Sequence, residues 1–262
     1  MQDNRGKTVV EDFLKQVNRA STAMLLLDYD GTLAPFQAER NGAYPYPGIV
    51  SILDRIIRSG RTKVFIISGR PAREIQTLLN PLSEIEIWGA HGLEHLLADG
   101  TYQCTTIDAS IQEILAQAQE WLHGAGLSHM AEIKPGGIAV HWRGLPDSEI
   151  KRVKARTCEG WNRFTGNHEL RLLEFDGGIE LRITHPDKGD AISAVLKRAY
   201  LGAPVAFLGD DLTDEDAFRV LGEWGLSILV RPEYRKTRAN AWLRPPQELI
   251  RFLRQWSKAL SV

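Results

Sequence analysis

Two acidic clusters carry the strongest chemical signal in the sequence. The first, DYDGT at residues 28–32, follows the apolar run 23–27, and the second, GDDLTDED at residues 209–216, follows the apolar run 205–208. Neighbouring carboxylates repel one another, and their charge is costly to hold together unless a cation offsets it. Magnesium prefers oxygen ligands and combines one or two carboxylates with a substrate phosphate. The clusters together predict a metal site, while an exposed acidic turn and a helix cap are the simpler interpretations of each cluster alone.

Two further features suit a phosphate group. Ser68-Gly69-Arg70 follows the apolar run 64–67, and a serine hydroxyl with backbone N–H groups at a helix start would bind phosphate oxygens. Turn chemistry explains this tripeptide equally well. Lys188 is expected in the first turn of a helix, where its charge opposes the helix dipole. A role beside phosphate and carboxylates explains that position better than a structural role, and an exposed lysine is the plain alternative.

The two ends of the sequence alternate strand-like and helix-like segments. Continuous apolar runs predict buried strands of a parallel sheet, and segments with one apolar face predict helices between them. The predicted strands are 23–27, 64–67, 85–88, 205–208 and 226–230, and the predicted helices are 9–18, 47–59, 72–79 and 246–260. This alternation predicts an α/β fold with a doubly wound parallel sheet, whose ligand site lies at the carboxyl ends of its strands.

The middle of the chain has a different order of elements. It reads helix, strand, strand, helix, strand, strand, and short glycine-containing turns join the paired strands, which predicts antiparallel pairing. These segments are 110–123, 131–134, 138–142, 147–164, 170–174 and 179–183. We therefore expect an inserted α+β domain at residues 100–184 within an α/β core formed by residues 1–99 and 185–262.

Composition argues against some classes of partner. The chain has 262 residues with 32 basic and 33 acidic side chains, and this near-neutral balance gives no electrostatic footprint for nucleic acid. Its apolar runs are too short to span a bilayer, and residues 1–10 lack the apolar core of a signal peptide. The two cysteines, Cys104 and Cys158, form no disulfide framework. The expectation is a cytoplasmic monomer with no membrane or nucleic-acid partner.

Taken in order, four motifs resemble those of the haloacid dehalogenase-like (HAD-like) phosphatase superfamily. They are DYDGT, the strand-end Ser68, Lys188 and GDDLTDED. The long segment between Ser68 and Lys188 resembles superfamily members that carry an inserted cap domain. The resemblance therefore implies a Rossmann-like phosphatase core whose cap determines the substrate.

A closer resemblance, over about residues 20–225, is to the trehalose-6-phosphate phosphatases. It is carried by GAHGLE at residues 89–94, by EIK at 132–134, by HWR at 141–143 and by Glu180 before Lys188. Two departures lie where a sugar would be bound. Many relatives have a lysine shortly before the glutamate equivalent to Glu180, where this chain has Asp176 and Gly177, and Trp142 replaces the usual tyrosine. The exact sugar is therefore left open.

This resemblance implies a role for each matching residue in the hydrolysis of trehalose 6-phosphate, a phosphorylated disaccharide. Asp28 would be the nucleophile that forms an aspartyl-phosphate, and Asp30 would be the general acid and then the general base. Ser68 and Lys188 would hold the phosphoryl oxygens. The Mg²⁺ ligands would be Asp28, Asp30, Asp210, Asp214 and Asp211. The substrate-binding residues would be Arg70, His91, Glu132, Lys134, Arg143 and Glu180, although charged residues are also common on a solvated sheet face.

Three other functions compete with this one. The first is a phosphatase of the same fold for another sugar phosphate, such as a sucrose, glucosylglycerol or mannosylglycerate phosphate. The second is a non-catalytic partner of a trehalose-phosphate synthase, which would be expected to have lost Asp28 or Asp30. The third is a receiver domain phosphorylated on aspartate, which Asp30, the insertion and Lys188 fit poorly.

Overall fold

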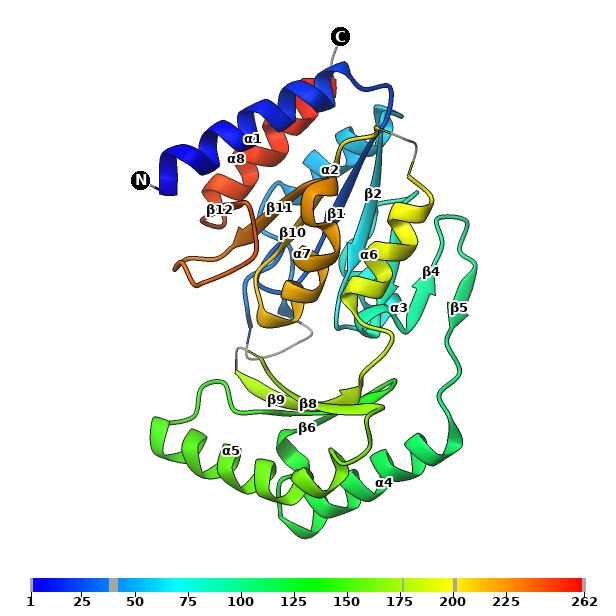
Figure 1. The fold of residues 1–262 in the computed structure, drawn as a ribbon, viewed down its shortest axis with the longest axis vertical. Helices are drawn as coiled ribbons and strands as arrows, with labels where there is room; N and C mark the ends of the chain where they lie inside the picture. Colours follow the sequence, from blue (N-terminus) through cyan, green and yellow to red (C-terminus); the bar gives the residue numbers. More distant parts are fainter. Residues whose placement is uncertain (1, 38–41, 176, 200–201, 261–262) are drawn as a thin grey trace. The chain divides into compact units, whose positions relative to one another are not determined.

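The computed structural model describes residues 2–37, 42–175, 177–199 and 202–260. The chain divides into two compact units, which we describe separately (Figure 1). The core unit comprises Met1–Gln103 and Lys188–Val262, and the inserted unit comprises Cys104–Asp187. No helix within the described residues is both long enough and apolar enough to cross a membrane.

The core unit is built on one sheet. Its strands are β1 (Ala23–Leu27), β2 (Thr62–Ile67), β3 (Glu86–Gly89), β4 (Glu94–Leu96), β5 (Tyr102–Cys104), β10 (Val205–Gly209), β11 (Leu226–Val230) and β12 (Ala241–Leu243). They follow the order β12-β11-β10-β1-β2-β3-β4-β5. Neighbouring strands from β12 to β3 pair in parallel, and β4 pairs antiparallel with β3. The helices are α1 (Gln2–Arg19), α2 (Ile49–Arg58), α3 (Ala72–Leu78), α6 (Lys188–Lys197), α7 (Glu215–Leu221) and α8 (Gln247–Leu260).

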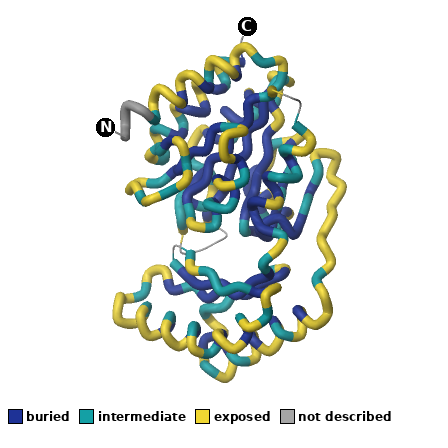
Figure 2. The backbone as a smooth tube through the Cα atoms, viewed as in Figure 1, coloured by how far each residue is buried: buried dark blue, intermediate teal, exposed yellow. Residues whose placement is uncertain are grey.

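Successive residues of the central strands divide between two apolar clusters. Leu25 and Leu27 of β1 lie in a cluster with apolar residues of α1, α2, α3 and α8. Met24 and Leu26 lie in a second cluster with residues of α6 and α7. Strand side chains point alternately to the two faces of a sheet, so a strand that is apolar at every position is buried on both. The sheet is thus the middle of three layers, and Figure 2 shows its central strands buried.

The order of the parallel strands reverses beside β1. The chain continues from β1 to β2 and β3 on one side, and returns through β10, β11 and β12 on the other. In such sheets ligands bind outside the carboxyl ends of the strands at the point of reversal. Asp28 directly follows β1 and Asp210 directly follows β10, so both lie at this point. The predicted doubly wound α/β fold is confirmed, whereas the three-residue strands β4, β5 and β12 were not predicted.

The inserted unit is an antiparallel sheet with two helices on one face (Figure 1). Its strands are β6 (Ala131–Lys134), β7 (Gly137–His141), β8 (Leu170–Phe175) and β9 (Gly178–Ile183), and its helices are α4 (Ala109–Gly124) and α5 (Asp147–Trp161). The strands follow the order β6-β7-β9-β8. Glu174 of β8 pairs with Lys154 of α5, which identifies the helix-covered face. Since side chains alternate along a strand, Glu132, Lys134 and Glu180 lie on the opposite face.

Candidate active site

A buried lysine lies between two carboxylates at the carboxyl ends of β1 and β10. Lys188 is the first residue of α6, and its Nζ lies 2.6 Å from Asp28 Oδ1 and 2.7 Å from Asp214 Oδ1. All three side chains are at most 5% exposed. The N–H of Asp28 donates to the carbonyl of Leu208 at 2.8 Å, which extends the pairing of β1 with β10. The sheet therefore fixes the backbone of Asp28, and Lys188 orients its side chain.

The charged state of this cluster depends on the ions around it. Burial raises the pKa of the Asp28 carboxyl to about 7, although the ammonium group of Lys188 partly opposes this. Burial, and then the carboxylates of Asp28 and Asp214, raise the pKa of Asp210 well above its usual range. Burial lowers the pKa of Lys188, but Asp214 and Asp28 more than offset this and raise it. The lysine is therefore a fixed positive charge, and added positive charge would favour full ionisation of the acids at neutral pH.

The donor set of the cluster fits a divalent cation. Carboxylate oxygens of Asp28, Asp210 and Asp214 lie within 4.8 Å of one another, and all three residues are buried. Among the described residues Asp210 Oδ2 has no hydrogen-bond partner, and Arg231 Nη1 stands 3.9 Å from it. Three carboxylates against the ammonium of Lys188 and the more distant guanidinium of Arg231 leave a charge of −1 when all are ionised. Oxygen ligands with uncompensated negative charge are what a magnesium site provides.

Two glycines allow these carboxylates to come together. Gly31 has a φ of +76°, and a Cβ there would lie 2.3 Å from Asp210 Oδ2. At Gly209 a Cβ would lie 2.4 Å from Asp214 Cγ. A side chain at either position would displace an acid from the cluster.

Asp214 also holds the loop that carries Asp210. Its Oδ2 accepts hydrogen bonds from the N–H groups of Asp210 and Asp211, each at 2.9 Å. Asp211 Oδ1 accepts a hydrogen bond from the N–H of Leu212 at 2.7 Å and caps the short helix η5 (Leu212–Asp214). The group of clustered carboxylates does not include Asp211, so its contact with a metal stays a prediction.

Asp30 is paired with an arginine. Nε and Nη2 of Arg70 donate to Oδ2 and Oδ1 of Asp30, each at 2.7 Å, and Nη1 pairs with Glu74 of α3. The N–H of Arg70 donates to Ser68 Oγ at 3.1 Å, and both residues are buried. Arg70, which follows β2, thus orients Asp30, which follows β1. The contact of Arg70 with substrate stays a prediction.

His91 lies against the turn at residues 68–70. Its N–H donates to the carbonyl of Ser68 at 2.9 Å, and a Cβ at Gly69 would lie 2.7 Å from the His91 ring. Glu94, from the same GAHGLE motif, accepts a hydrogen bond at 2.6 Å from the first N–H of α3. The motif therefore supports the turn that carries Ser68, and a substrate contact by His91 stays a prediction.

Three of the predicted substrate-binding residues come together on the sheet of the inserted unit. Lys134 Nζ lies 3.2 Å from Glu180 Oε1 and 3.9 Å from Glu132 Oε2. The strand register explains this arrangement, because Glu132 of β6 and Glu180 of β9 both pair with Ala139 of β7. The three side chains thus form one polar cluster on the face opposite α4 and α5.

Two aromatic residues on this face, His141 and Phe175, have no role predicted from the sequence. His141 Nε2 lies 2.7 Å from Glu132 Oε2, and the rings of His141 and Phe175 lie 5.3 Å apart at an edge-on angle. His141 stands two residues from Ala139 on β7, so the two-residue alternation of a strand places it beside Glu132. That alternation is the signal that could have found it.

Arg143 follows β7 beside the turn that joins β8 to β9. A Cβ at Gly177 would lie 2.9 Å from Arg143 Nε, so the glycine leaves space for the guanidinium group. Trp142 is buried, and its N–H donates to the carbonyl of Gly177 at 2.9 Å. Asp176, one of the two departures from the family pattern, lies outside the described residues.

Two arginines beside the second acidic motif were also missed. Arg231 Nη1 and Arg235 Nε donate to the main-chain carbonyl of Asp210, at 3.5 and 3.4 Å. Both follow β11, in a segment with four basic residues between positions 231 and 238. That concentration of charge after a predicted strand is the signal that the sequence offered.

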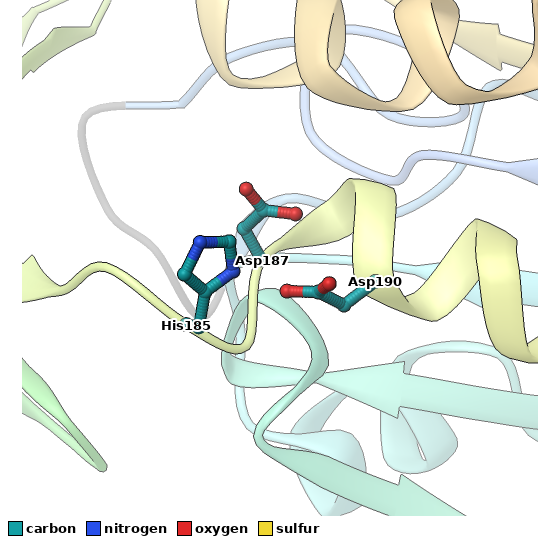
Figure 3. Close-up of side chains that lie close together, drawn as sticks. All are labelled: His185, Asp187 and Asp190. Atoms are coloured by element: carbon teal, nitrogen blue, oxygen red, sulfur yellow. The ribbon is translucent and has the colours of Figure 1, made fainter.

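Figure 3 shows another group of potential metal ligands: His185 and Asp187 lie just before α6, and Asp190 lies in its first turn. His185 and Asp190 are exposed, and Asp187 lies 3.4 Å from Arg171. Exposed acidic groups are common without a metal. We therefore assign no site to this group.

Comparison with known proteins agrees with the motifs. Residues 26–245 match the profile of the trehalose-phosphatase family. The trehalose-phosphate phosphatases of Mycobacterium tuberculosis (strain ATCC 25618 / H37Rv) and Mycolicibacterium paratuberculosis (strain ATCC BAA-968 / K-10) are 33% and 34% identical to this chain over 229 and 234 residues. These regions cover 84% of this chain and 56% and 57% of the relatives. The chain thus spans about half the length of the relatives that it matches.

Solved structures share the fold. The C-terminal domain of Candida albicans trehalose-6-phosphate phosphatase has a TM-score of 0.81 at 20% identity, with 96% of both chains covered. A haloacid dehalogenase-like hydrolase from B. subtilis has a TM-score of 0.64 at 15% identity, covering 89% of this chain and 99% of that one. The C-terminal domain of the C. albicans trehalose synthase regulatory protein has a TM-score of 0.68 at 12% identity, covering 94% and 97%. With the HAD-like fold and the matched residues 26–245, the chain belongs to the trehalose-phosphatase family.

Proposed function

We propose that this chain is a Mg²⁺-dependent phosphatase that hydrolyses trehalose 6-phosphate to trehalose and phosphate through an aspartyl-phosphate on Asp28. The observation that carries the proposal is the buried cluster of Asp28, Asp210 and Asp214 around Lys188, at the point where the strand order reverses. In the part of the chain that the structure describes, no group forms a hydrogen bond with Asp210 Oδ2. A buried cluster with excess negative charge is costly to a fold and is explained by a cationic ligand.

In the first step, a carboxylate oxygen of Asp28 attacks the phosphorus atom. The bond between phosphorus and the sugar oxygen breaks, and Asp30 gives its proton to that oxygen. In the second step, water attacks the phosphorus of the aspartyl-phosphate while Asp30 takes a proton from the water. This releases phosphate and restores both carboxyl groups. Arg70 occupies both oxygens of Asp30 at 2.7 Å, so Asp30 has to leave Arg70 before it can donate a proton.

The remaining core residues hold charge in place. Lys188 and Ser68 would donate hydrogen bonds to the phosphoryl oxygens, where negative charge accumulates in the transition state. Mg²⁺ would be held by Asp28, Asp210 and Asp214 and by the main-chain carbonyl of Asp30, and it would supply positive charge beside the same oxygens when bound. Asp211 would contribute through water.

The inserted unit would act as the cap that reads the sugar, as predicted for residues 100–184. Phosphate chemistry is common to many esters, so discrimination has to come from groups that bind the rest of the substrate. The carboxylates of Glu132 and Glu180 and the ammonium of Lys134 form one cluster, and such groups bind sugar hydroxyls well. Arg143 and His91 are the further candidates for contact with the substrate.

A non-catalytic role is the second candidate. The observation in its favour is the fold shared with a regulatory protein from C. albicans, at 12% identity. Against it, Asp28, Asp30 and Lys188 are all present, and Lys188 Nζ lies 2.6 Å from Asp28 Oδ1. We therefore favour the enzyme. The expected monomeric state and cytoplasmic location stay predictions, which sedimentation and cell fractionation would test.

The test is phosphate release from a panel of sugar phosphates, with and without Mg²⁺, by the wild type and by Asp28→Asn. The proposal expects release from trehalose 6-phosphate that needs Mg²⁺ and is lost in the variant. A preference for a sucrose, glucosylglycerol or mannosylglycerate phosphate would keep the core chemistry and refute the assignment of the sugar. Release that persists in Asp28→Asn would refute the mechanism.

A further inference from the structure

The segment after β11 meets the acidic loop that follows β10. Arg235 Nη2 donates to the carbonyl of Asp211 at 2.7 Å, and its Nε and Nη2 reach the carbonyl of Asp210, both at 3.4 Å. Arg235 Nη1 pairs with Glu215, the first residue of α7. Arg231 donates to the same carbonyl of Asp210 at 3.5 Å. One guanidinium group thus joins two consecutive peptide carbonyls to a carboxylate at the start of the next helix.

The carboxylate that receives Arg235 is itself fixed. Glu215 Oε1 accepts a hydrogen bond from Thr237 Oγ1 at 2.7 Å, and Oε2 accepts one from the N–H of Arg238 at 2.9 Å. The anchor for Arg235 is therefore a carboxylate that two further hydrogen bonds hold in place.

These contacts fix both peptide groups that flank the Cα of Asp210. Its N–H is held by Asp214 Oδ2 at 2.9 Å, and its carbonyl is held by Arg235 and Arg231. With both peptide planes fixed, only the side-chain torsions of Asp210 stay free. Asp210 Oδ2, which packs against Gly31 and accepts no hydrogen bond within the described part of the chain, is thereby held near the carboxylates of Asp28 and Asp214.

We infer that Arg235 is a positioning residue of the metal site, which acts by orienting the backbone of Asp210 and Asp211. The inference rests on the proposed function, since it presumes that Asp210 binds a divalent cation. If Arg235 acted only as a nearby positive charge, its removal would have the opposite effect on metal affinity. A positive charge close to a metal site repels the cation, so its removal would tighten metal binding. If Arg235 positions the backbone, metal binding should instead weaken when the planar guanidinium group is lost, even if the positive charge is kept.

Arg235→Lys separates the two effects. Lysine keeps the positive charge but has a single nitrogen, which cannot join two carbonyls and a carboxylate as a guanidinium does. Arg238→Lys is the matched control, because it is the same change in the same segment at an exposed side chain. Arg235→Gln removes the positive charge as well as the guanidinium group.

The experiment is a titration of the full, metal-free chain with Mn²⁺, which prefers oxygen ligands as Mg²⁺ does. Binding is measured by calorimetry and by the electron paramagnetic resonance signal of free Mn²⁺. We expect Arg235→Lys and Arg235→Gln to bind Mn²⁺ about 10–100-fold more weakly than the wild type, the usual effect of residues that orient metal ligands. Arg238→Lys should bind as the wild type does. Thermal unfolding of the metal-free variants shows whether each is folded.

Wild-type affinity in a folded Arg235→Lys, or tighter binding by Arg235→Gln, would overturn the inference and leave the proposed function intact. Asp210→Asn should lose Mn²⁺ binding, which assigns the signal to this site. A wild type that binds no Mn²⁺ would instead refute the metal site itself, and the inference with it.

Discussion

The carboxylate cluster of the core unit and the polar cluster of the inserted unit are built in different ways. In the core, Lys188 contacts Asp28 and Asp214 at 2.6 and 2.7 Å. Asp28 directly follows β1, whose end is fixed by pairing, and Asp214 is held by hydrogen bonds to the loop after β10. In the inserted unit, Lys134 stands 3.2 and 3.9 Å from its two glutamates, and all three project from a sheet face. A reaction centre needs groups held in advance of the substrate. A face that recognises a sugar needs hydrogen-bond donors and acceptors that the sugar hydroxyls can engage.

This difference gives a general expectation. Changes in the core cluster should slow the hydrolysis of every phosphate ester. Changes in the inserted unit should affect the disaccharide phosphate and spare a simple aryl phosphate, which has no sugar to be read. Hydrolysis of trehalose 6-phosphate and of 4-nitrophenyl phosphate therefore distinguishes the two kinds of change.

The largest effect is expected for Lys188→Met. The substitution removes the positive charge between Asp28 and Asp214 and one donor to the phosphoryl oxygens, so kcat should fall about 10²–10³-fold for both substrates. Steady-state kinetics at saturating Mg²⁺ measures this. Lys197→Met, at the exposed end of the same helix, should leave kcat unchanged. A loss confined to trehalose 6-phosphate would assign Lys188 to sugar recognition and break the comparison.

A smaller effect, on stability, is expected for Asp210→Asn. The folded-state pKa of Asp28 is about 7 against 3.8 for the ordinary carboxyl, and that of Asp210 is also raised. A carboxyl with a raised pKa costs stability as pH rises from the ordinary value through the folded value. Metal-free Asp210→Asn should therefore be more stable than the metal-free wild type at pH 8, by about 1–3 kcal/mol. The difference should shrink towards pH 4.

Thermal unfolding of the two proteins at several pH values, with and without Mg²⁺, measures this. Mg²⁺ at pH 8 should stabilise the wild type and leave Asp210→Asn unchanged, because binding to the folded state alone raises stability. Equal stabilisation of both proteins by Mg²⁺ would place the metal elsewhere.

The smallest effect is expected for Glu180→Gln. Loss of one hydrogen bond between a charged group and a sugar hydroxyl costs about 1.5 kcal/mol, so KM for trehalose 6-phosphate should rise about tenfold. Hydrolysis of 4-nitrophenyl phosphate should be unaffected. Glu174→Gln, on the helix-covered face beside Lys154, is the matched control and should change neither substrate. An equal loss with both substrates would mean that Glu180 supports the core chemistry instead.

The core was predictable because its chemistry follows from topology. An apolar run that ends in an acid predicts a buried parallel strand, and the carboxyl ends of such strands meet at one edge, so Asp28 and Asp210 could be brought together from the sequence. The bounds of β1 were predicted to the residue, since all five of its residues are apolar. The three-residue strands β4, β5 and β12 are too short to show a periodicity.

Other features depend on contacts that no local pattern reveals. Arg70, whose contact with substrate stays a prediction, also pairs with Asp30, forty residues away in the sequence. Arg235 reaches Asp211 from twenty-four residues further along the chain. Long charged side chains pair across the tertiary structure, and the sequence shows only that they are charged. Their partners could be read only from the folded chain.

The most direct test of the account asks whether the phosphoryl group passes through Asp28. In Asp30→Asn the base for the second step is missing, but 4-nitrophenolate leaves without protonation, so the first step should still proceed with 4-nitrophenyl phosphate. Rapid mixing with this ester should give a burst of one nitrophenolate per chain, and acid-quenched protein should carry hydroxylamine-sensitive phosphate on the peptide that contains Asp28. If the wild type turns over the ester while the variant shows no burst and no phosphate on that peptide, the account is contradicted.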